Sequence, residues 1–257
     1  MKDKKIVLLA GNGQSSAIVF NSVNKIFGIH TAIIEKKENQ KVFLKRRVKR
    51  LGFSTVLGQV IFQLFVVKFL NIFSKKRCQE IMKTNSLNIS KIPREKIRSV
   101  ESVNTAKTIK LLRELKPDLI IVNGTRIISD DVLSSVSCRF INIHAGITPK
   151  YRGVHGAYWA MVNDDIRNCG VTVHLVDTGI DTGNIIFQSE VIPSKKDNFS
   201  TYPLLQLSEG VKLLNIAVQN ILENKLVTNN EELTESYLWY HPTIWKYLYY
   251  RVIRGVK

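Results

Sequence analysis

The stretch INIHAGITPKYRG, residues 141–153, decides the fold class because a buried strand ends there in polar side chains. Successive side chains of a strand point to opposite faces, so Asn142 and His144 share one face and the isoleucines beside them share the other. Burying two neighbouring polar groups costs free energy unless each finds a partner. Gly146 and Pro149 then end the strand. We therefore expect the pair at the carboxyl end of a strand, where open α/β sheets bind their ligands.

Apolar runs of strand length alternate with helical patterns along most of the chain. This alternation is typical of a layered α/β fold with a largely parallel sheet flanked by helices. Strands are predicted at 5–10, 31–35, 118–124, 139–144, 171–177 and 184–192, and helices at 14–26, 104–115, 129–136, 155–163 and 201–223.

A chain of 257 residues, 44% of them hydrophobic, can bury one good core. We predict a main domain at 1–223, with a helical insertion at about 40–90, and a C-terminal extension at 224–257. The three cysteines are scattered without a CxxC pair, which favours a reducing compartment over a disulfide or zinc framework. The N-terminal apolar run is too short for a signal peptide. The expected location is the cytoplasm, and no metal is predicted.

The net charge of +17 is unusual for a chain of this composition. Six lysines and arginines lie within KVFLKRRVKR, residues 41–50. Such basicity favours an anionic partner: nucleic acid, a membrane surface or a phosphorylated substrate. No nucleic-acid-binding signature accompanies it, so we predict no specific nucleic acid partner. A solvated basic helix is the alternative interpretation of 41–50.

The next segment, residues 54–73, is nearly long enough to span a bilayer, but Lys68 and several amides interrupt it. An amphipathic helix fits better than a membrane span. This helix either packs on the domain or lies on a membrane surface. The aromatic and basic tail at 237–257 has the same two interpretations. Its predicted apolar face comprises Ile61, Phe62, Phe65, Val66, Phe69, Ile72 and Phe73.

The first loop, AGNGQSS at 10–16, follows a strand and opens a helix, so its backbone N–H groups can hold a phosphate. Glu35 at the end of the second strand also permits a dinucleotide interpretation, which we reject because Ser16 replaces the third glycine. A plain tight turn remains the alternative. The predicted substrate-binding residues here are Gly11, Asn12, Gly13, Gln14 and Ser15.

A second polar loop, VDTGIDTGNII at 176–186, crowds two aspartates and two glycines into one turn between strands. An isolated aspartate in a turn carries little meaning, because aspartate is a common turn former. Joined to a strand-end Asn-x-His, however, Asp181 becomes a specific candidate. A carboxylate there can orient the imidazole of His144 or hold its charged form.

These motifs together resemble the folate-dependent formyltransferase family. NIH followed by TPKYRG, and VHLVDTGIDTG about thirty residues later, carry the resemblance over residues 100–200, with a weaker likeness at 5–25. The family includes glycinamide ribonucleotide transformylase, the catalytic domain of methionyl-tRNA formyltransferase, and the sugar N-formyltransferases. The resemblance implies a Rossmann-like fold and N10-formyltetrahydrofolate as co-substrate.

Carried over by position, the family's catalytic triad falls on Asn142, His144 and Asp181. Asn142 and protonated His144 would donate hydrogen bonds to the oxyanion, and Asp181 would support His144 and relay the amine proton. His174 is interpreted as a structural histidine. The resemblance implies pterin contacts at Arg126, Ile127, Ile128, Asp177, Gly179 and Ile180, with a simple surface charge as the alternative interpretation of Arg126. Lys150, Tyr151 and Arg152 are expected to meet an anionic substrate, and a solvated turn is the alternative there.

The favoured acceptor is the primary amine of a nucleotide-linked amino sugar, and the expected partner is thus a phosphorylated or nucleotide-linked small molecule. Glycinamide ribonucleotide is the alternative acceptor, supported by AGNGQSSA. A formyltetrahydrofolate hydrolase is a further alternative, whereas methionyl-tRNA is disfavoured because no separate C-terminal domain is expected. A basic membrane-surface or nucleic-acid-binding module without catalysis is the alternative of another class. The oligomeric state stays open.

Overall fold

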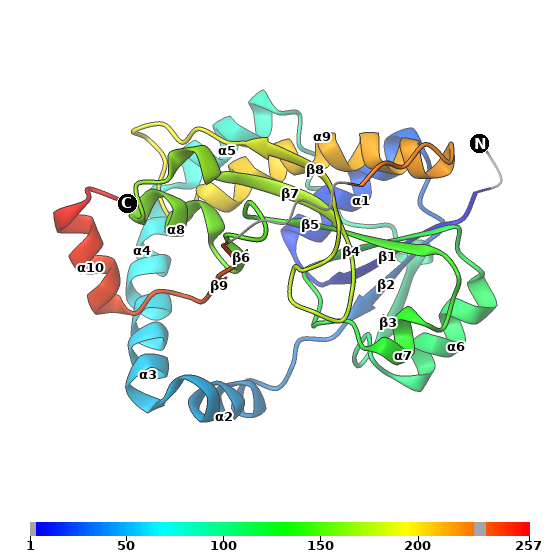
Figure 1. Cartoon of the computed structure of the whole chain (residues 1–257), viewed down its shortest axis with the longest axis horizontal. Helices are drawn as coiled ribbons and strands as arrows, with labels where there is room; N and C mark the ends of the chain where they lie inside the picture. The colour runs from blue at the N-terminus through cyan, green and yellow to red at the C-terminus, as the bar shows by residue number, and fades with distance from the viewer. Residues whose placement is uncertain (1–3, 229–234) are drawn as a thin grey trace.

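The computed structural model describes residues 4–228 and 235–257, and its centre is one seven-stranded sheet (Figure 1). The strand order is β3-β2-β1-β4-β5-β7-β8; the first five strands pair in parallel, and β7 and β8 are antiparallel. The predicted largely parallel sheet is confirmed. The strands are β1 Ile6–Gly11, β2 Thr31–Glu35, β3 Ile97–Val100, β4 Leu119–Asn123, β5 Arg139–His144, β7 Gly170–Leu175 and β8 Ile185–Glu190.

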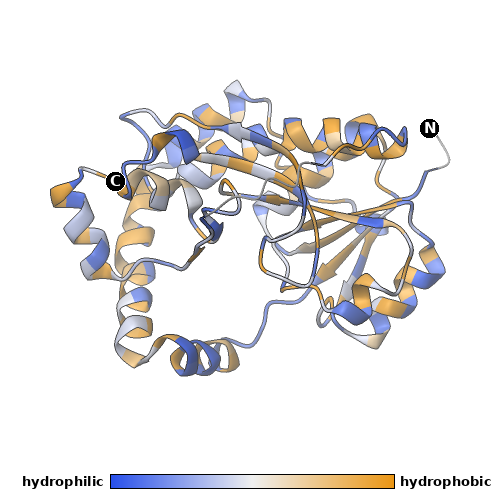
Figure 2. Cartoon of the chain, viewed as in Figure 1, coloured by the Kyte–Doolittle hydropathy of each residue, from blue (hydrophilic) through white to orange (hydrophobic). Residues whose placement is uncertain are grey.

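Helices cover both faces of this sheet, and hydrophobic residues run along the strands between them (Figure 2). Alternate side chains of β1 face opposite layers: Leu8 packs towards α1 and α9, whereas Leu9 packs towards α6 and α7. The helices are α1 Gln14–Ile26, α5 Lys75–Thr84, α6 Ala106–Leu115, α7 Asp130–Leu133, α8 Gly156–Val162, α9 Tyr202–Leu222 and α10 Ile244–Ile253, with 3-10 turns at Arg94–Lys96 and Ile166–Asn168.

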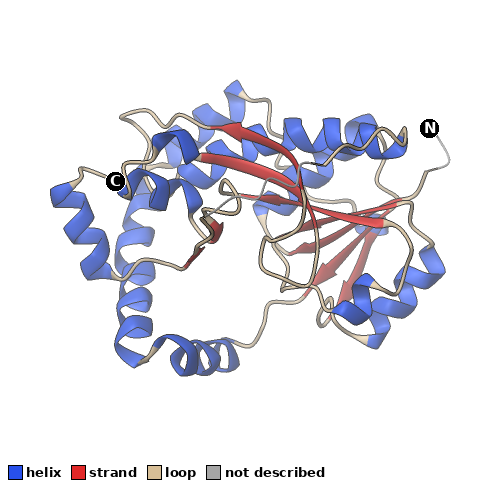
Figure 3. Cartoon of the chain, in the orientation of Figure 1, coloured by secondary structure: helices blue, strands red, loops and turns tan. Residues whose placement is uncertain are grey.

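The insertion forms an arm of helices at one end of the molecule (Figure 3). Helix α2, Gln40–Leu51, is followed after Gly52 by one continuous helix that comprises α3 Phe53–Ile61, a π-helical turn at Phe62–Val67 and α4 Lys68–Phe73. The C-terminal segment returns to this arm. Its short strand β9, Leu238–Trp239, pairs with β6, Arg152–Gly153.

The predicted apolar face of residues 54–73 is divided in the structure. Phe62 is fully buried, with ring centroids 4.9 Å from Phe199 and 5.0 Å from Tyr247 of α10. Phe65 and Phe69 are instead 68% and 59% exposed. The prediction of a single face was therefore wrong: one side of the helix packs on a second aromatic core with α8 and α10, and the other side is open.

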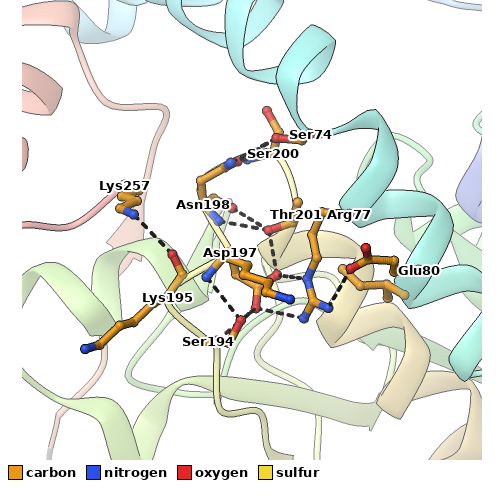
Figure 4. Close-up of polar contacts among 12 residues, drawn as sticks. Ser74, Arg77, Glu80, Ser194, Lys195, Asp197, Asn198, Ser200, Thr201 and Lys257 are labelled. Carbon is orange, nitrogen blue, oxygen red and sulfur yellow. Dashed lines mark hydrogen bonds and ion pairs between the residues drawn. The ribbon is translucent and has the colours of Figure 1, made fainter.

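A partly buried ion pair fastens the far end of the arm to the domain (Figure 4). The Arg77 guanidinium donates from Nε to Asp197 Oδ1 at 2.8 Å and from Nη2 to Asp197 Oδ2 at 3.0 Å. Asp197 is buried and also accepts from Ser194, while Ser74 and Asn198 join the same two segments. Because a bidentate pair fixes both distance and angle, the arm is held rigidly at α5.

Candidate active site

The carboxyl end of β5 supplies the two polar side chains at the site. The antiparallel register sets Asn142 opposite His174 and His144 opposite Thr172 of β7. His144 is 5% exposed and His174 is 3% exposed. The sheet thus encloses both imidazoles, and each needs hydrogen-bond partners there.

Asp181 is brought to these histidines by the tight loop between β7 and β8. Its backbone takes a left-handed conformation, with φ of 51°, which is unusual for a residue other than glycine. One carboxylate oxygen lies 3.2 Å from His144 Nδ1 and accepts from the Gly153 N–H at 3.0 Å; the other lies 3.7 Å from His174 Nε2. The structure therefore brings the three predicted catalytic residues together.

Both ring nitrogens of His144 face oxygen atoms. Nε2 donates to the Tyr151 carbonyl at 2.7 Å, and Nδ1 faces the Asp181 carboxylate. Two acceptors suit the imidazolium, since only that form carries two N–H groups. Burial nevertheless lowers the pKa of His144, against the charge of Asp181, which raises it. The net pKa of His144 lies below its ordinary value.

Asp181 stays ionised in this setting. Burial raises the pKa of Asp181, but the charge of His144 and the hydrogen bond from the Gly153 N–H lower it, and the net pKa lies below the ordinary value. A carboxylate beside a buried imidazole is the arrangement that stabilises the imidazolium.

Asn142 is oriented by His174. His174 Nδ1 lies 2.6 Å from the Leu175 carbonyl, so it carries the proton, and its Nε2 accepts from Asn142 Nδ2 at 3.2 Å. The other N–H of Asn142 Nδ2 takes no part in this hydrogen bond. His174 is thus a satisfied structural histidine that holds the amide of Asn142 in place.

A cavity of about 610 Å³ opens over Asn142, His144 and Asp181. Two loops form much of its wall, at 124–128 after β4 and at 177–181 after β7. All the predicted pterin contacts border the cavity: Arg126, Ile127, Ile128, Asp177, Gly179 and Ile180. Their role stays a prediction, but their position fits it.

Glu35 holds the first of these loops in shape. The buried carboxylate accepts from the Arg126 backbone N–H at 2.7 Å, from Arg126 Nη1 at 2.8 Å and from the Val103 N–H at 3.1 Å. Arg126 is therefore anchored rather than a free surface charge. The strand-end acid that suggested a dinucleotide site braces the cavity wall instead.

The predicted substrate residues are placed less well. Of the first loop only Ser15 borders the cavity. Gly11 lies close to the main chain that follows β4, so a Cβ at Gly11 would sit 2.4 Å from the Gly124 carbonyl oxygen. Asn12, Gly13 and Gln14 lie beside the cavity and do not line it.

The second predicted substrate set, Lys150, Tyr151 and Arg152, is not among the residues that line the cavity, and its role stays a prediction. Lys150 pairs with Asp165 and Glu235, at 2.9 and 3.1 Å. Tyr151 is fully buried and its hydroxyl donates to Asp165. Arg152 donates to the Ile180 carbonyl at 3.1 Å, so it supports the loop that carries Asp181.

The far wall of the cavity was missed by sequence reasoning. Helix α2 contributes Arg46, Arg47 and Arg50, and the C-terminal segment contributes Leu238 to His241. The Arg50 guanidinium lies 4.7 Å from the centre of the Tyr240 ring. Burial, with the charge of Arg50, lowers the pKa of Arg47. The basic run 41–50 was the available signal, but its target could not be deduced from the sequence.

Comparison with known proteins agrees with the fold. Residues 66–203, more than half of the chain, match the family model described as formyl transferase. The chain belongs to the formyl transferase family, and the resemblance drawn from the NIH and DTGIDTG motifs is confirmed.

Relatives extend the likeness in sequence and in structure. A methionyl-tRNA formyltransferase of Caldanaerobacter subterraneus is 29% identical over 153 residues, 59% of this chain and 48% of that protein. A sugar N-formyltransferase from a Shewanella species superposes with a TM-score of 0.57 at 16% identity, covering 91% of this chain and 76% of the other. Phosphoribosylglycinamide formyltransferase of Anaplasma phagocytophilum gives 0.58 at 17%, covering 92% and 98%. The chain thus spans about half the length of this curated relative. The structural likenesses, at such low sequence identity, show the fold alone.

Proposed function

We propose that this protein transfers a formyl group from N10-formyltetrahydrofolate to a primary amine. The observation that carries the proposal is the convergence of Asn142, His144 and Asp181 at the floor of one cavity in a formyl transferase fold. An amide donor, a buried imidazole and a carboxylate are the groups that acyl transfer to an amine requires.

Each residue has a distinct task in this proposal. The free N–H of Asn142 Nδ2 donates to the formyl oxygen, on which negative charge builds as the amine attacks. Asp181 holds the charged form of His144, whose positive ring stabilises the same oxygen. The attacking amine must lose a proton; the Asp181 carboxylate accepts it, directly or through a water molecule, and returns it to N10 of the leaving tetrahydrofolate as the bond from N10 to the formyl carbon breaks.

The co-substrate supplies the formyl group, and the loops at 124–128 and 177–181 would hold its pterin ring. Apolar walls from Val122, Ile128 and Val176 suit a flat aromatic ring, and the loops add polar main-chain groups for its edge. Glu35, by fixing Arg126, keeps that slot in shape.

The acceptor that fits the far wall is an amine on a phosphorylated or nucleotide-linked molecule. Arg46, Arg47 and Arg50 place three cations across the cavity from the triad, where they can pair with phosphate oxygens. Tyr240 and Trp239 add aromatic surface on which a base can stack. We therefore favour a nucleotide-linked amino sugar, and glycinamide ribonucleotide is the second candidate because the Gly11–Ser15 loop adjoins the cavity.

Incubation with N10-formyltetrahydrofolate and a panel of amines tests the proposal by mass spectrometry. The panel contains nucleotide-linked amino sugars, glycinamide ribonucleotide and methionyl-tRNA. Formylation of an amino sugar supports the favoured acceptor, and formylation of glycinamide ribonucleotide alone replaces it by the alternative. Release of formate without any amine product would indicate a hydrolase, and binding of neither co-substrate nor amine would indicate a module without catalysis.

For the location we propose the cytoplasm. The cysteines at 78, 138 and 169 are free, and burial raises the pKa of the Cys138 thiol to about 11, which keeps it unreactive. Free, unreactive thiols are typical of reducing compartments.

A further inference from the structure

An apolar stripe runs along the helix Phe53–Phe73, on the side that does not pack on the domain. Its members recur at helical spacing, so they form one continuous strip. Each is between 44% and 69% exposed, whereas Val56 and Phe62 on the packed side are buried. Contiguous apolar surface of this kind marks an interaction site. The stripe comprises Phe53, Leu57, Leu64, Phe65, Phe69, Ile72 and Phe73.

Helix α10 extends this surface from the other end of the sequence. Trp245 packs on α3 at Gly58, where a Cβ would lie 2.2 Å from the indole ring. The indole is nevertheless 48% exposed, so the exposed surface of α10 begins beside that of α3. It continues along α10 through Leu248, Tyr249 and Val252, which are 52–80% exposed. Both helices stand at the end of the molecule opposite the N-terminus (Figure 1).

The charge of the protein is concentrated in the same two segments. Residues 39–79 hold ten lysines and arginines and no acidic residue, and residues 236–257 hold four and none. These segments therefore carry fourteen of the seventeen net positive charges. On α2, Lys41, Lys45 and Lys49 recur at every fourth position and are exposed, on the side away from the cavity-lining arginines.

We propose that this face, comprising the stripe of residues 53–73, the exposed side of α10 and the lysines of α2, docks on an anionic lipid surface. An apolar stripe flanked by cations and aromatic rings is the composition of helices that lie in a membrane interface. Lys68 within the stripe can extend its ammonium group to the headgroups while its stem stays in the apolar layer.

The helix lies along the lipid surface rather than through it. Its length of 21 residues, with a mean hydropathy of 1.9 over its most apolar 18-residue window, would by length and composition suffice for a span. However, Phe62 is locked into the aromatic core, and the Arg77–Asp197 pair fastens the following helix to the domain. A helix held along one side by its own domain has only the other side to offer.

Two other occupants fit the surface less well. A second copy of the chain would bring the same positive charge against itself, which opposes association. RNA would neutralise the cations but leave the phenylalanines of the stripe in water. Anionic lipid is the partner that satisfies both the charge and the apolar area.

Co-sedimentation with vesicles tests the proposal with the full chain. One set contains phosphatidylglycerol and phosphatidylcholine, and the other contains phosphatidylcholine alone. We expect binding to the anionic set at low salt and release at high salt, because screening weakens the attraction. We expect no binding to the neutral set. The double variant Lys45→Gln, Lys49→Gln should weaken binding by about fivefold for each lysine removed.

The apolar contribution is tested with Phe65→Glu, Phe69→Glu. We expect this pair to lower the affinity for anionic vesicles by about a hundredfold, because two rings leave the apolar layer. The matched control is Ile26→Glu, Val227→Glu: Ile26, at the end of α1, and Val227, in the segment after α9, are 59% and 74% exposed, and the variant adds the same two charges. Phe73→Ser, which adds no charge, gives a second reading should the double variant unfold.

Several outcomes would overturn the proposal. Wild-type protein that ignores anionic vesicles at low salt does so, as does equal loss of binding in the control pair. A dimer in light scattering that Phe65→Glu, Phe69→Glu dissolves, without vesicle binding, would assign the face to a second copy. A gel shift with RNA, without vesicle binding, would assign it to nucleic acid.

Discussion

Among single residues, His241 joins the cavity wall formed by the C-terminal segment to the rest of the protein. Its Nδ1 lies 2.9 Å from both His155 Nε2 and Gln63 Nε2, so the C-terminal segment, α8 and the insertion meet at one imidazole. Burial, with the charge of Arg47, lowers the pKa of His241 to about 4, and burial also lowers the pKa of His155 well below its ordinary value. The cavity wall packs in this way while His241 and His155 are both uncharged.

This pair predicts a loss of stability in mild acid. Between pH 6.5 and 4 the unfolded chain binds the His241 proton and the folded chain does not, so stability falls as pH drops through that window. For His241 the loss from pH 7 to pH 5 is about 2 kcal/mol. Urea unfolding at the two pH values should show it, and His241→Asn should reduce the difference by that amount. The exposed His30→Asn is the control; an unchanged difference in His241→Asn would refute the assignment.

Gly13 carries a second prediction at this scale. It precedes α1 with an extended backbone, and a Cβ there meets nothing nearer than 4.0 Å. A bulky residue such as Leu is therefore tolerated by the fold but covers the helix N-terminus beside Ser15. If the loop holds phosphate, Gly13→Leu raises KM for the phosphorylated acceptor and leaves KM for the folate unchanged. Equal KM values in the folded variant would make the loop a plain turn.

Among the elements, α2 presents two different faces. Phe43 and three arginines border the cavity, whereas Lys45 and Lys49 point elsewhere and are exposed. Gly52, with φ of 83°, lets the chain turn sharply from α2 into α3. Helix α2 thereby borders the same cavity as Asn142, His144 and Asp181.

The two faces of α2 give a matched pair of variants. Arg46→Ala, Arg50→Ala should raise KM for the anionic acceptor by about tenfold or more per charge-assisted hydrogen bond lost. KM for the folate should stay unchanged, because the pterin loops lie on the opposite wall. Lys45→Ala, Lys49→Ala changes the charge equally and should leave both values unchanged. Steady-state kinetics with soluble acceptor checks this, and equal effects of the two pairs would remove α2 from the site.

Elements with a strong local pattern were predictable from the sequence. The alternation of β5 fixed Asn142 and His144 on one face, and DTGIDTG indicated a loop between two strands, because these patterns depend on near neighbours. The cavity wall of α2 and the pairing of β9 with β6 were not predictable, since they join residues more than eighty positions apart. The surroundings of Lys150 were not predictable for a related reason: Glu235, one of its two carboxylate partners, lies far along the chain.

In the whole molecule, one hydrophobic core covers each face of the sheet and a separate aromatic core lies between the arm, α8 and α10, where the Arg77–Asp197 pair also fastens the arm. Asp197 is buried and Arg77 is partly exposed, so Arg77→Leu, which removes both charge-assisted hydrogen bonds, should lower the free energy of unfolding by about 1.5–3 kcal/mol. Lys212→Ala, which breaks the surface pair with Glu209, should cost at most about 1 kcal/mol. Urea unfolding of both variants checks the contrast. Similar losses in the two would mean that the arm is not held by this pair.

The central claim is that Asn142, His144 and Asp181 transfer a formyl group to an amine. The most direct measurement follows a ¹³C-labelled formyl group from N10-formyltetrahydrofolate by NMR, with a nucleotide-linked amino sugar as acceptor. In the wild type we predict that the label appears as a formamide of the sugar. Asn142→Ala and His144→Ala should each lower kcat by about 100-fold, with the fold intact. A label that stays on the folate, or near-normal turnover in both variants, would contradict the claim.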